Sequence, residues 1–367
     1  MSHTRRNALR IIGGGTIIAA AAAGGFLATR RPDRALEPWS QAGEFDDPRL
    51  WALSYGLLAP NPHNRQPWIV EMTGDAQFTL YRDTERDLPE TDPFHRQLTI
   101  GLGCFLELTS IAAAETGHQM SVDLYPEGET GPVAVATLTT GAEKDPLFAQ
   151  IPHRRSCRAP FEPEAINNSQ AEALSKFATI ITDRATVERL RTLTWDAWLT
   201  EAMTPRTNKE SVDLMRFGKA EINANPDGIH LGGPMLETFM LLGMLTREAQ
   251  LDPNSSGFQQ GVKVYRDMLA ATQNYAVITS DGNSRAEQID AGRKWVRLNL
   301  TTTALGLSLH PVSQALQEFP EMAPHYEAAH GLLAPNGGTV QMLGRLGYGP
   351  TVPATPRWPL ESRLRHV

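Results

Sequence analysis

The chain has 367 residues, of which 41% are hydrophobic and 20% are charged, and its formal net charge is −7. This length allows two domains or one large body of two lobes. The acidic balance argues against nucleic acid as a partner, because contacts to phosphate supply most of that affinity. Two cysteines without a C-x-x-C pair exclude a zinc ribbon and a thioredoxin-like motif.

The N-terminal segment, residues 1–31, carries an export pattern. Residues 4–10 read T-R-R-N-A-L-R, and an uncharged run rich in Ala and Gly follows at 11–28. This arrangement resembles a twin-arginine signal. Eighteen helical residues span about 27 Å, which is marginal against a hydrocarbon core of about 30 Å. We expect contact with the twin-arginine export machinery and a periplasmic or exported location. An uncleaved membrane anchor stays open, and a disordered basic tail is the alternative.

Residues 32–150 predict a first lobe of strands and helices. Phe78 to Tyr81 alternates between apolar and polar residues, as a half-buried strand does. The run from Ile100 to Ala114 is strongly apolar and contains several small residues. In chain order we expect a polar linker at 32–46, a helix at 47–58, a proline-rich loop at 59–67, strands at 68–70 and 78–81, a helix at 100–114, and paired strands at 122–125 and 133–138.

Residues 151–367 predict a second lobe with a helical insertion. The insertion, at about 184–260, is a possible lid over a site. Its Met- and Leu-rich part at 235–244 suits an adaptable cover, although core packing is the role that we expect for it. The other expected elements are a helix at 170–176, a buried strand at 178–182, a continuous apolar strand at 275–279, a helix at 291–307, a strand at 340–343 and a proline-rich tail.

A faint internal repeat links the two lobes. Residues 101–117 align with residues 291–307: both are apolar helices that begin with small residues and end near a glycine. The sequence therefore predicts two related lobes in one chain.

The stretch from Ile151 to Phe161, I-P-H-R-R-S-C-R-A-P-F, places Arg154, Arg155 and Arg158 around Ser156. The rigid fork of N–H donors on arginine matches phosphate oxygens, and the serine hydroxyl can donate one more bond. Taken alone, the stretch also fits a solvated basic loop.

Two further stretches favour the phosphate interpretation. Residues 60–68 read P-N-P-H-N-R-Q-P-W, and residues 352–360 read V-P-A-T-P-R-W-P-L. With the arginine loop, they resemble the flavin-binding segments of the FMN-dependent nitroreductase superfamily. The order of the motifs and the export pattern resemble its fused, single-chain branch, called Acg-type. The resemblance implies an α+β, nitroreductase-like fold with mixed sheets flanked by helices, in which two lobes form a pseudo-dimer within one monomer.

The resemblance also implies a binding site for FMN. The arginine loop and Arg357 would hold the phosphate, while Asn64 and Gln66 would meet the ribityl chain and the flavin ring. His63 stands where the family has a small hydroxyl residue, and His310 is either a proton donor or substrate contact or a purely structural histidine. The predicted cofactor-binding residues are Pro62, His63, Asn64, Gln66, Pro67, Arg154, Arg155, Ser156, Arg158, His310, Pro311, Val312 and Arg357.

The implied activity is hydride or electron transfer from NAD(P)H or another reduced donor to a nitroaromatic or quinone-like acceptor. No side chain is expected to act as a catalytic nucleophile, and no metal site is expected, since His325 and His330 are misplaced for one on a helix. The alternative is a protein that holds or sequesters flavin without turnover, with its active face covered. A serine hydrolase is disfavoured because no G-x-S-x-G elbow occurs.

Overall fold

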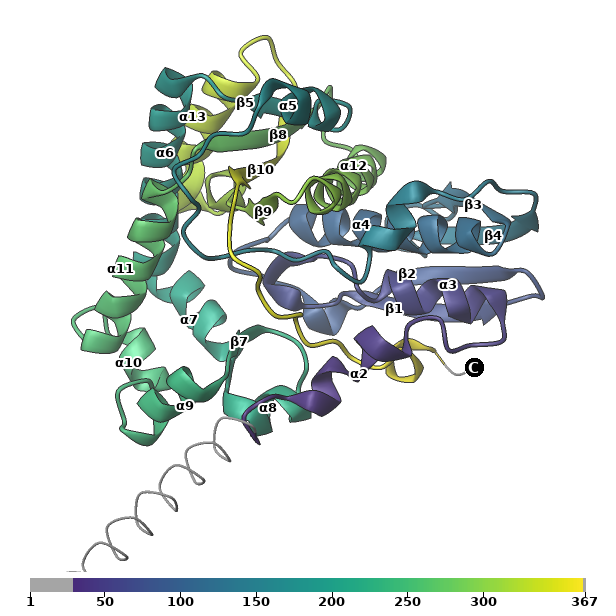
Figure 1. Cartoon of the computed structure of the whole chain (residues 1–367), viewed down its shortest axis with the longest axis horizontal. Helices are drawn as coiled ribbons and strands as arrows, with labels where there is room; N and C mark the ends of the chain where they lie inside the picture. The colour runs from purple at the N-terminus through teal and green to yellow at the C-terminus, as the bar shows by residue number, and fades with distance from the viewer. Residues whose placement is uncertain (1–28, 366–367) are drawn as a thin grey trace, which may run out of the picture.

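The computed structural model describes residues 29–365 (Figure 1). The predicted twin-arginine motif and the apolar run at 11–28 lie outside the described residues. Among those that are described, one helix, α4 (Arg96–Glu115), is long and apolar enough to cross a membrane, but most of it is buried inside the protein. It is a core helix of the first lobe.

The first lobe is built on a four-stranded sheet in the order β1-β2-β4-β3. Helix α3 (Pro48–Gly56) precedes the sheet, and α4 connects its second strand to its third. Asp47 caps α3 by accepting a hydrogen bond from the Arg49 amide, and Pro48 occupies the first turn, where its missing N–H costs nothing. The strands are β1 (Trp68–Thr73), β2 (Gln77–Arg82), β3 (His118–Leu124) and β4 (Ala134–Thr140).

The second lobe repeats this plan. Its sheet has the order β5-β8-β10-β9, which is again first, second, fourth and third along the chain. Helix α5 (Asn168–Leu174) precedes the first strand, and α12 (Arg285–Ala304) connects the second strand to the third. The strands are β5 (Thr179–Ile181), β8 (Asn274–Ser280), β9 (Ser308–Pro311) and β10 (Thr339–Gly347). The repeat predicted from the sequence is thus matched by a repeat of topology.

Strand direction differs from the expectation of mixed sheets. All pairs within the two four-stranded sheets are antiparallel. Parallel pairing occurs instead in the separate pair of β6 (Met215–Phe217) and β7 (Ile229–Leu231), and in the bridge between Val70 and Leu364. In the first sheet a short connection joins the first two strands, whereas in the second sheet a long helical insertion joins them. Both pairs of strands are antiparallel.

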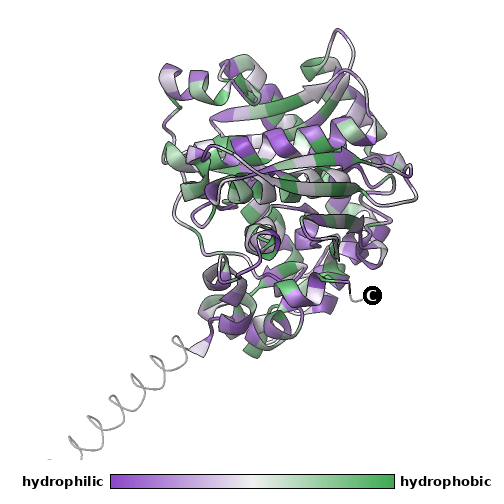
Figure 2. Cartoon of the chain, turned by 90° about the vertical axis from the view of Figure 1, so that its right-hand side faces the viewer, coloured by the Kyte–Doolittle hydropathy of each residue, from purple (hydrophilic) through white to green (hydrophobic). Residues whose placement is uncertain are grey.

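Helices α4 and α12 pack against each other at the centre of the molecule (Figure 1). A Cβ on Gly103 would lie 2.2 Å from the carbonyl oxygen of Ile289, and one on Gly292 would lie 2.0 Å from that of Ile100. The close approach is reciprocal, so each helix places a glycine against the backbone of the other. The apolar core extends from this contact into both sheets, whose strands carry many of the green hydrophobic residues in Figure 2.

Between β5 and β8 the chain forms the predicted helical insertion. Its helices are α6 (Arg184–Met203), α7 (Pro205–Asp213), α8 (Gly218–Ala224), α9 (Pro234–Leu241), α10 (Arg247–Leu251) and α11 (Ser256–Ala270). Helix α6 packs on the second sheet together with α13 (Ala323–Leu333), around a second core that includes Leu190, Tyr275 and Leu316.

Several elements differ from their sequence-based expectation. The linker at 32–46 contains a helix, α2 (Asp33–Gln41), whose residues Ala35 and Pro38 are buried. Strand β5 is only partly buried, because it lies at the edge of its sheet. Strand β9 and helix α13 were not predicted. Short 3-10 turns complete the description: η1 (Pro62–Asn64), η2 (Thr84–Arg86), η3 (Pro146–Gln150), η4 (Ser313–Leu316), η5 (Pro320–Met322) and η6 (Leu360–Arg363).

Candidate functional site

The loop between α3 and β1 is held in a strained backbone conformation. His63, Asn64 and Gln66 have φ values of 45°, 51° and 53°, in the left-handed region that residues other than glycine rarely adopt. Strain of this kind costs on the order of 1 kcal/mol or more per residue and clusters at functional sites. The Asn61 side chain fixes the loop, since its Oδ1 accepts a hydrogen bond from the Gln66 amide at 2.7 Å.

The polar side chains of this loop bind other parts of the chain. Gln66 is fully buried; its Nε2 donates to the Pro226 carbonyl at 2.7 Å, and its Oε1 accepts from the Trp358 amide at 2.9 Å. Asn64 Oδ1 accepts from Arg357 Nη1 at 2.7 Å. The loop therefore joins the helical insertion to the C-terminal segment. A contact between the Gln66 side chain and a flavin would require these bonds to be exchanged.

Arg154 and Arg357 lie beside this loop, and each is only 2% exposed. Arg154 donates from Nη1 to Asn299 Oδ1 at 3.0 Å and from Nη2 to the Leu58 carbonyl at 2.8 Å. Arg357 Nη2 donates to the same Leu58 carbonyl at 3.2 Å. Within residues 29–365 neither guanidinium has a carboxylate at ion-pair distance, and the buried Nε of Arg154 has no hydrogen-bond partner there.

The two cations are electrostatically unsatisfied. Burial, and then the charge of Arg155, lower the pKa of Arg154 to about 10. Burial followed by Arg154 and Arg155 lowers the pKa of Arg357 well below its ordinary value. Arg155 itself stacks on Trp39 of α2, with its guanidinium carbon 4.6 Å from the ring centroid. Buried like charges of this kind are stabilised by an anion, and among the described residues no acid supplies one.

The other predicted members of the arginine loop, Ser156 and Arg158, are exposed. Burial is the largest cause that lowers the pKa of three histidines, and the charge of Arg158 contributes to each of them. In His230 the charge of Arg357, and in His310 that of Arg345, contributes more than Arg158. The pKa falls to about 4 in His63, to about 3 in His230 and well below the ordinary value in His310. The three imidazoles come from η1, β7 and β9, and all are neutral at neutral pH.

His310, Pro311 and Val312 belong to strand β9 and its end, not to a helix end. His310 Nδ1 accepts from Arg345 Nε at 3.2 Å, and Arg345 Nη2 reaches back to the Ala159 carbonyl at 2.7 Å. The arginine loop is thereby tied to β9. The Val312 amide already donates to the Leu343 carbonyl at 2.9 Å, and Pro311 has no amide hydrogen. This stretch therefore offers little free backbone donor capacity in the present arrangement.

The structure gathers most predicted residues, with Pro62 and Pro67 flanking the strained loop, and adds two that sequence reasoning missed. Asn299 on α12 receives Arg154 and donates to the Arg155 carbonyl at 3.3 Å. A lone Asn among apolar residues of a core helix was the available signal. His230 lies with its Nε2 3.4 Å from Asn64 Nδ2. Nothing in the local sequence of the insertion marked it.

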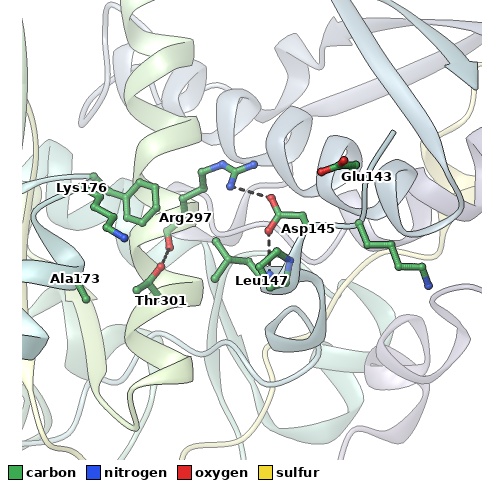
Figure 3. A pocket seen from close by; sticks show the side chains of 10 residues that line it. Glu143, Asp145, Leu147, Ala173, Lys176, Arg297 and Thr301 are labelled. Carbon is green, nitrogen blue, oxygen red and sulfur yellow. Dashed lines mark hydrogen bonds and ion pairs between the residues drawn. The ribbon is translucent and has the colours of Figure 1, made fainter. Parts of the chain in front are cut away.

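A separate hollow of about 480 Å³ lies between η3, the end of α5 and α12 (Figure 3). None of the predicted site residues lines it. Its most prominent polar groups satisfy each other, since Arg297 Nη1 pairs with Asp145 Oδ2 at 2.9 Å. In the part of the chain that is described, no cluster of three or more His, Cys, Asp or Glu side chains is placed to hold a metal ion.

No family profile matches the chain. A candidate NAD(P)H nitroreductase of Mycobacterium tuberculosis is 24% identical over 321 residues, which cover 83% of this chain and 87% of that protein. PigM of Serratia sp., a second candidate NAD(P)H nitroreductase, is 23% identical over 288 residues, which cover 72% and 80%.

Solved structures show a slighter likeness. A candidate nitroreductase of Anabaena variabilis has a TM-score of 0.41 at 13% identity, over 86% of this chain and 91% of that one. The FMN-dependent nitroreductase NfnB of Mycobacterium smegmatis has a TM-score of 0.38 at 17% identity, over 59% and 96%. Over most of its length the chain is thus similar in sequence to proteins named as NAD(P)H nitroreductases, and this supports the nitroreductase family that its three motifs indicated.

Proposed function

We propose that this chain is an FMN-dependent oxidoreductase of nitroreductase type, which passes hydride from a reduced donor to an electron-poor acceptor such as a nitroaromatic or a quinone. One observation carries the proposal. Two buried arginines, Arg154 and Arg357, lie without a carboxylate partner among the described residues, directly beside a strained Asn/Gln loop. The similarity to named nitroreductases supports it independently.

The charges fit a phosphate group. Arg154 keeps an unused buried Nε, while Ser156 and Arg158 are exposed on the same loop. A charge-assisted hydrogen bond contributes about 1.5–3 kcal/mol, so three such donors give a substantial part of cofactor affinity. Arg357 donates most of its N–H groups to backbone carbonyls and one to Asn64 Oδ1. It therefore contributes mainly positive charge and holds Asn64 in position.

FMN, when bound, supplies the hydride chemistry, and the protein supplies binding and orientation. The backbone of the strained loop is held in one conformation by Asn61 and Arg357, so it requires little further ordering. His63, His230 and His310 are neutral, so each can donate or accept one hydrogen bond but none carries a spare proton at neutral pH. Substrate protonation would then come from solvent.

We also propose one FMN per chain, in a protein divided into lobes at 32–150 and 151–367 that need not dimerise. The repeat of topology shows where a second Asn/Gln loop would lie: between α5 and β5. That connection is residues 175–178, S-K-F-A, and contains neither Asn nor Gln. The symmetry-related site therefore lacks one of its two halves.

A second function is supported by the helical insertion. Pro226 accepts from Gln66, the Gly228 amide donates to the Asn64 carbonyl at 3.3 Å, and His230 lies beside Asn64. The segment from Pro226 to His230 thus covers part of the predicted flavin loop. A protein that holds flavin and restricts access to it, without turnover, is the alternative.

Membership of the Acg-type branch and export through the twin-arginine machinery are proposals that rest on the sequence alone. Replacement of Arg5 and Arg6 by Lys would test the second. We expect a reporter fusion to stay in the cytoplasm, and undiminished export would contradict the proposal.

The decisive experiment is the visible spectrum of the purified protein under anaerobic conditions. An oxidoreductase would bring bound flavin, lose its absorbance on addition of NADH, NADPH or another reductant, and regain it with a quinone or nitroaromatic. Bound flavin that none of several donors reduces would favour the sequestering function. Failure to bind FMN at all would rule out both.

A further inference from the structure

The helix α9 and the turn after it carry an apolar surface. Met235 is 67% exposed, Leu241 75%, Leu242 66% and Met244 53%. We call these four residues the α9 patch. Core packing was expected here and is wrong, because these four side chains are exposed, while α9 is anchored to α8 through the buried Glu237, which accepts from the Lys219 amide at 3.1 Å. Four exposed apolar side chains within residues 235–244 mark an interaction surface.

The described chain begins beside α9. Arg30 Nη1 donates to Glu237 Oε2 at 3.0 Å, which places residue 30 on α9. The chain then continues into α2, whose Ala35 amide donates to Asn223 Oδ1 of α8 at 3.0 Å (Figure 1). The described chain, which follows the uncharged run at 11–28 in the sequence, therefore begins against α9.

We propose that the α9 patch rests on the surface of a lipid bilayer, beside the point at which residues 11–28 join the body. That run contains five glycines and is short for a hydrocarbon core of about 30 Å, so by itself it is a weak membrane signal. Stable attachment by weak signals requires two of them, and Met and Leu side chains can enter the boundary between headgroups and acyl chains.

Nearby charge is compatible with such an orientation. Arg31, whose side chain is 73% exposed, pairs with Asp33 at 3.3 Å, and Lys219 at the start of α8 lies 3.9 Å from the same carboxylate. Long basic side chains at the edge of an apolar surface can reach lipid phosphates while their stems stay in contact with the apolar region. The proposal does not depend on flavin binding.

A fluorescent probe in the full chain tests where the patch lies. Leu241→Cys would be labelled with an environment-sensitive dye, since the native Cys104 and Cys157 are buried. The protein is mixed with vesicles of phosphatidylcholine and phosphatidylglycerol, with and without a spin-labelled lipid. We expect a blue shift and quenching by the spin label. The control is Thr130→Cys in the exposed turn between β3 and β4, where neither change is expected.

Three outcomes would overturn the proposal. The Leu241 probe could behave like the Thr130 probe while the protein floats with the vesicles. It could be shielded before vesicles are added, in a concentration-dependent way, which would indicate a second copy on the patch. It could also be shielded at every concentration, which would indicate that another part of this chain covers it.

An affinity measurement gives a second, independent test. The double variant Leu241→Gln, Leu242→Gln in the full chain should lower the vesicle partition coefficient about tenfold or more, from the loss of two apolar contacts. Val264→Gln, a similarly exposed apolar position on α11, is the matched control and should leave it unchanged. Equal partitioning of the double variant and the control would contradict the proposal.

Discussion

Arg154 and Arg357 donate to the same carbonyl oxygen, that of Leu58, at 2.8 and 3.2 Å. One residue comes from the arginine loop and the other from the C-terminal segment, and they meet at the end of α3. Two buried guanidinium groups on one neutral acceptor are held together against their mutual repulsion. The place where the three motifs meet therefore carries positive charge that a bound anion would neutralise.

The first prediction concerns the binding of a phosphate group by these two arginines. Arg154→Ala should weaken FMN binding by at least tenfold while it affects riboflavin much less, because riboflavin lacks the phosphate. Arg357→Ala should show the same selectivity together with lower stability, since Arg357 also positions Asn64. Both affinities can be measured by flavin fluorescence quenching. Arg189→Ala, on the exposed face of α6, is the control. Equal losses for the two ligands would refute a phosphate role.

The second prediction concerns a carboxylate introduced next to Arg154 by substitution. Asn299→Asp places a carboxylate next to Arg154 Nη1, now 3.0 Å from the amide oxygen. The new carboxylate would compete with phosphate for the guanidinium, so FMN should bind several-fold more weakly. Asn299→Ala should weaken it less, because Arg154 loses only a neutral partner. If both variants bind FMN as the parent protein does, Arg154 does not contact the cofactor phosphate.

The fold was predictable where a pattern is local. The apolar runs behind α4 and α12 and the alternation in β2 depend on neighbours in the sequence, and these elements were predicted correctly. Helix α2 was missed because long-range contacts hold it: Trp39 donates to the Thr355 carbonyl and stacks under Arg155. Strand β9 was missed because a four-residue strand containing a proline gives no periodic signal.

The proximity of the candidate site residues was predictable where a motif carries several unusual residues together. Asn64, Gln66, Arg154 and Arg357 were named from such motifs, and the structure brings them into contact or adjacency. Asn299 and His230 stand alone in their segments, so only the fold reveals them. The sequence also could not show that the polar groups of Gln66 and Arg357 are hydrogen-bonded within the chain, since this depends on the backbone path of distant segments.

A third prediction concerns the contact between α4 and α12. Gly103→Ala and Gly292→Ala would each push a methyl group to about 2 Å from a backbone oxygen of the other helix, and neither helix can move without disturbing its sheet. We expect a loss in the free energy of unfolding of about 3 kcal/mol or more. Gly261→Ala, in α11 with open space around it, should be neutral or slightly stabilising. Denaturant titration checks all three.

A fourth prediction concerns Glu201, a buried carboxyl on α6 that accepts from Gln317 Nε2 at 2.9 Å. Burial, and then Glu210, raise its pKa to about 7 from the ordinary 4.5. The folded state therefore retains this proton at pH values where the unfolded state has lost it, so the contribution of Glu201 to stability falls as pH rises from about 4.5 to 7 and is level outside that window. The total is about 3 kcal/mol.

Glu201→Gln should remove this loss. The variant should match the parent protein near pH 4.5 and exceed its stability above pH 7, with the difference measured by denaturant titration at each pH. The exposed Glu172→Gln serves as the control and should leave the pH profile unchanged. A difference in stability between variant and parent that stays constant across this window would show that Glu201 is ionised in the folded state.

The last prediction concerns the number of cofactors. Each lobe has the same strand order, so a symmetric pair of sites would need two Asn/Gln loops and two arginine loops. The second lobe has only S-K-F-A between α5 and β5, and the segment at 32–46 before α3 carries a single arginine, Arg34. Flavin released by acid and compared with protein concentration should therefore give one FMN per chain, and light scattering in detergent should give a monomer. Two flavins per chain would show that the second half-site is rebuilt from residues outside these motifs, and one flavin per pair of chains would place the site between subunits instead of between lobes.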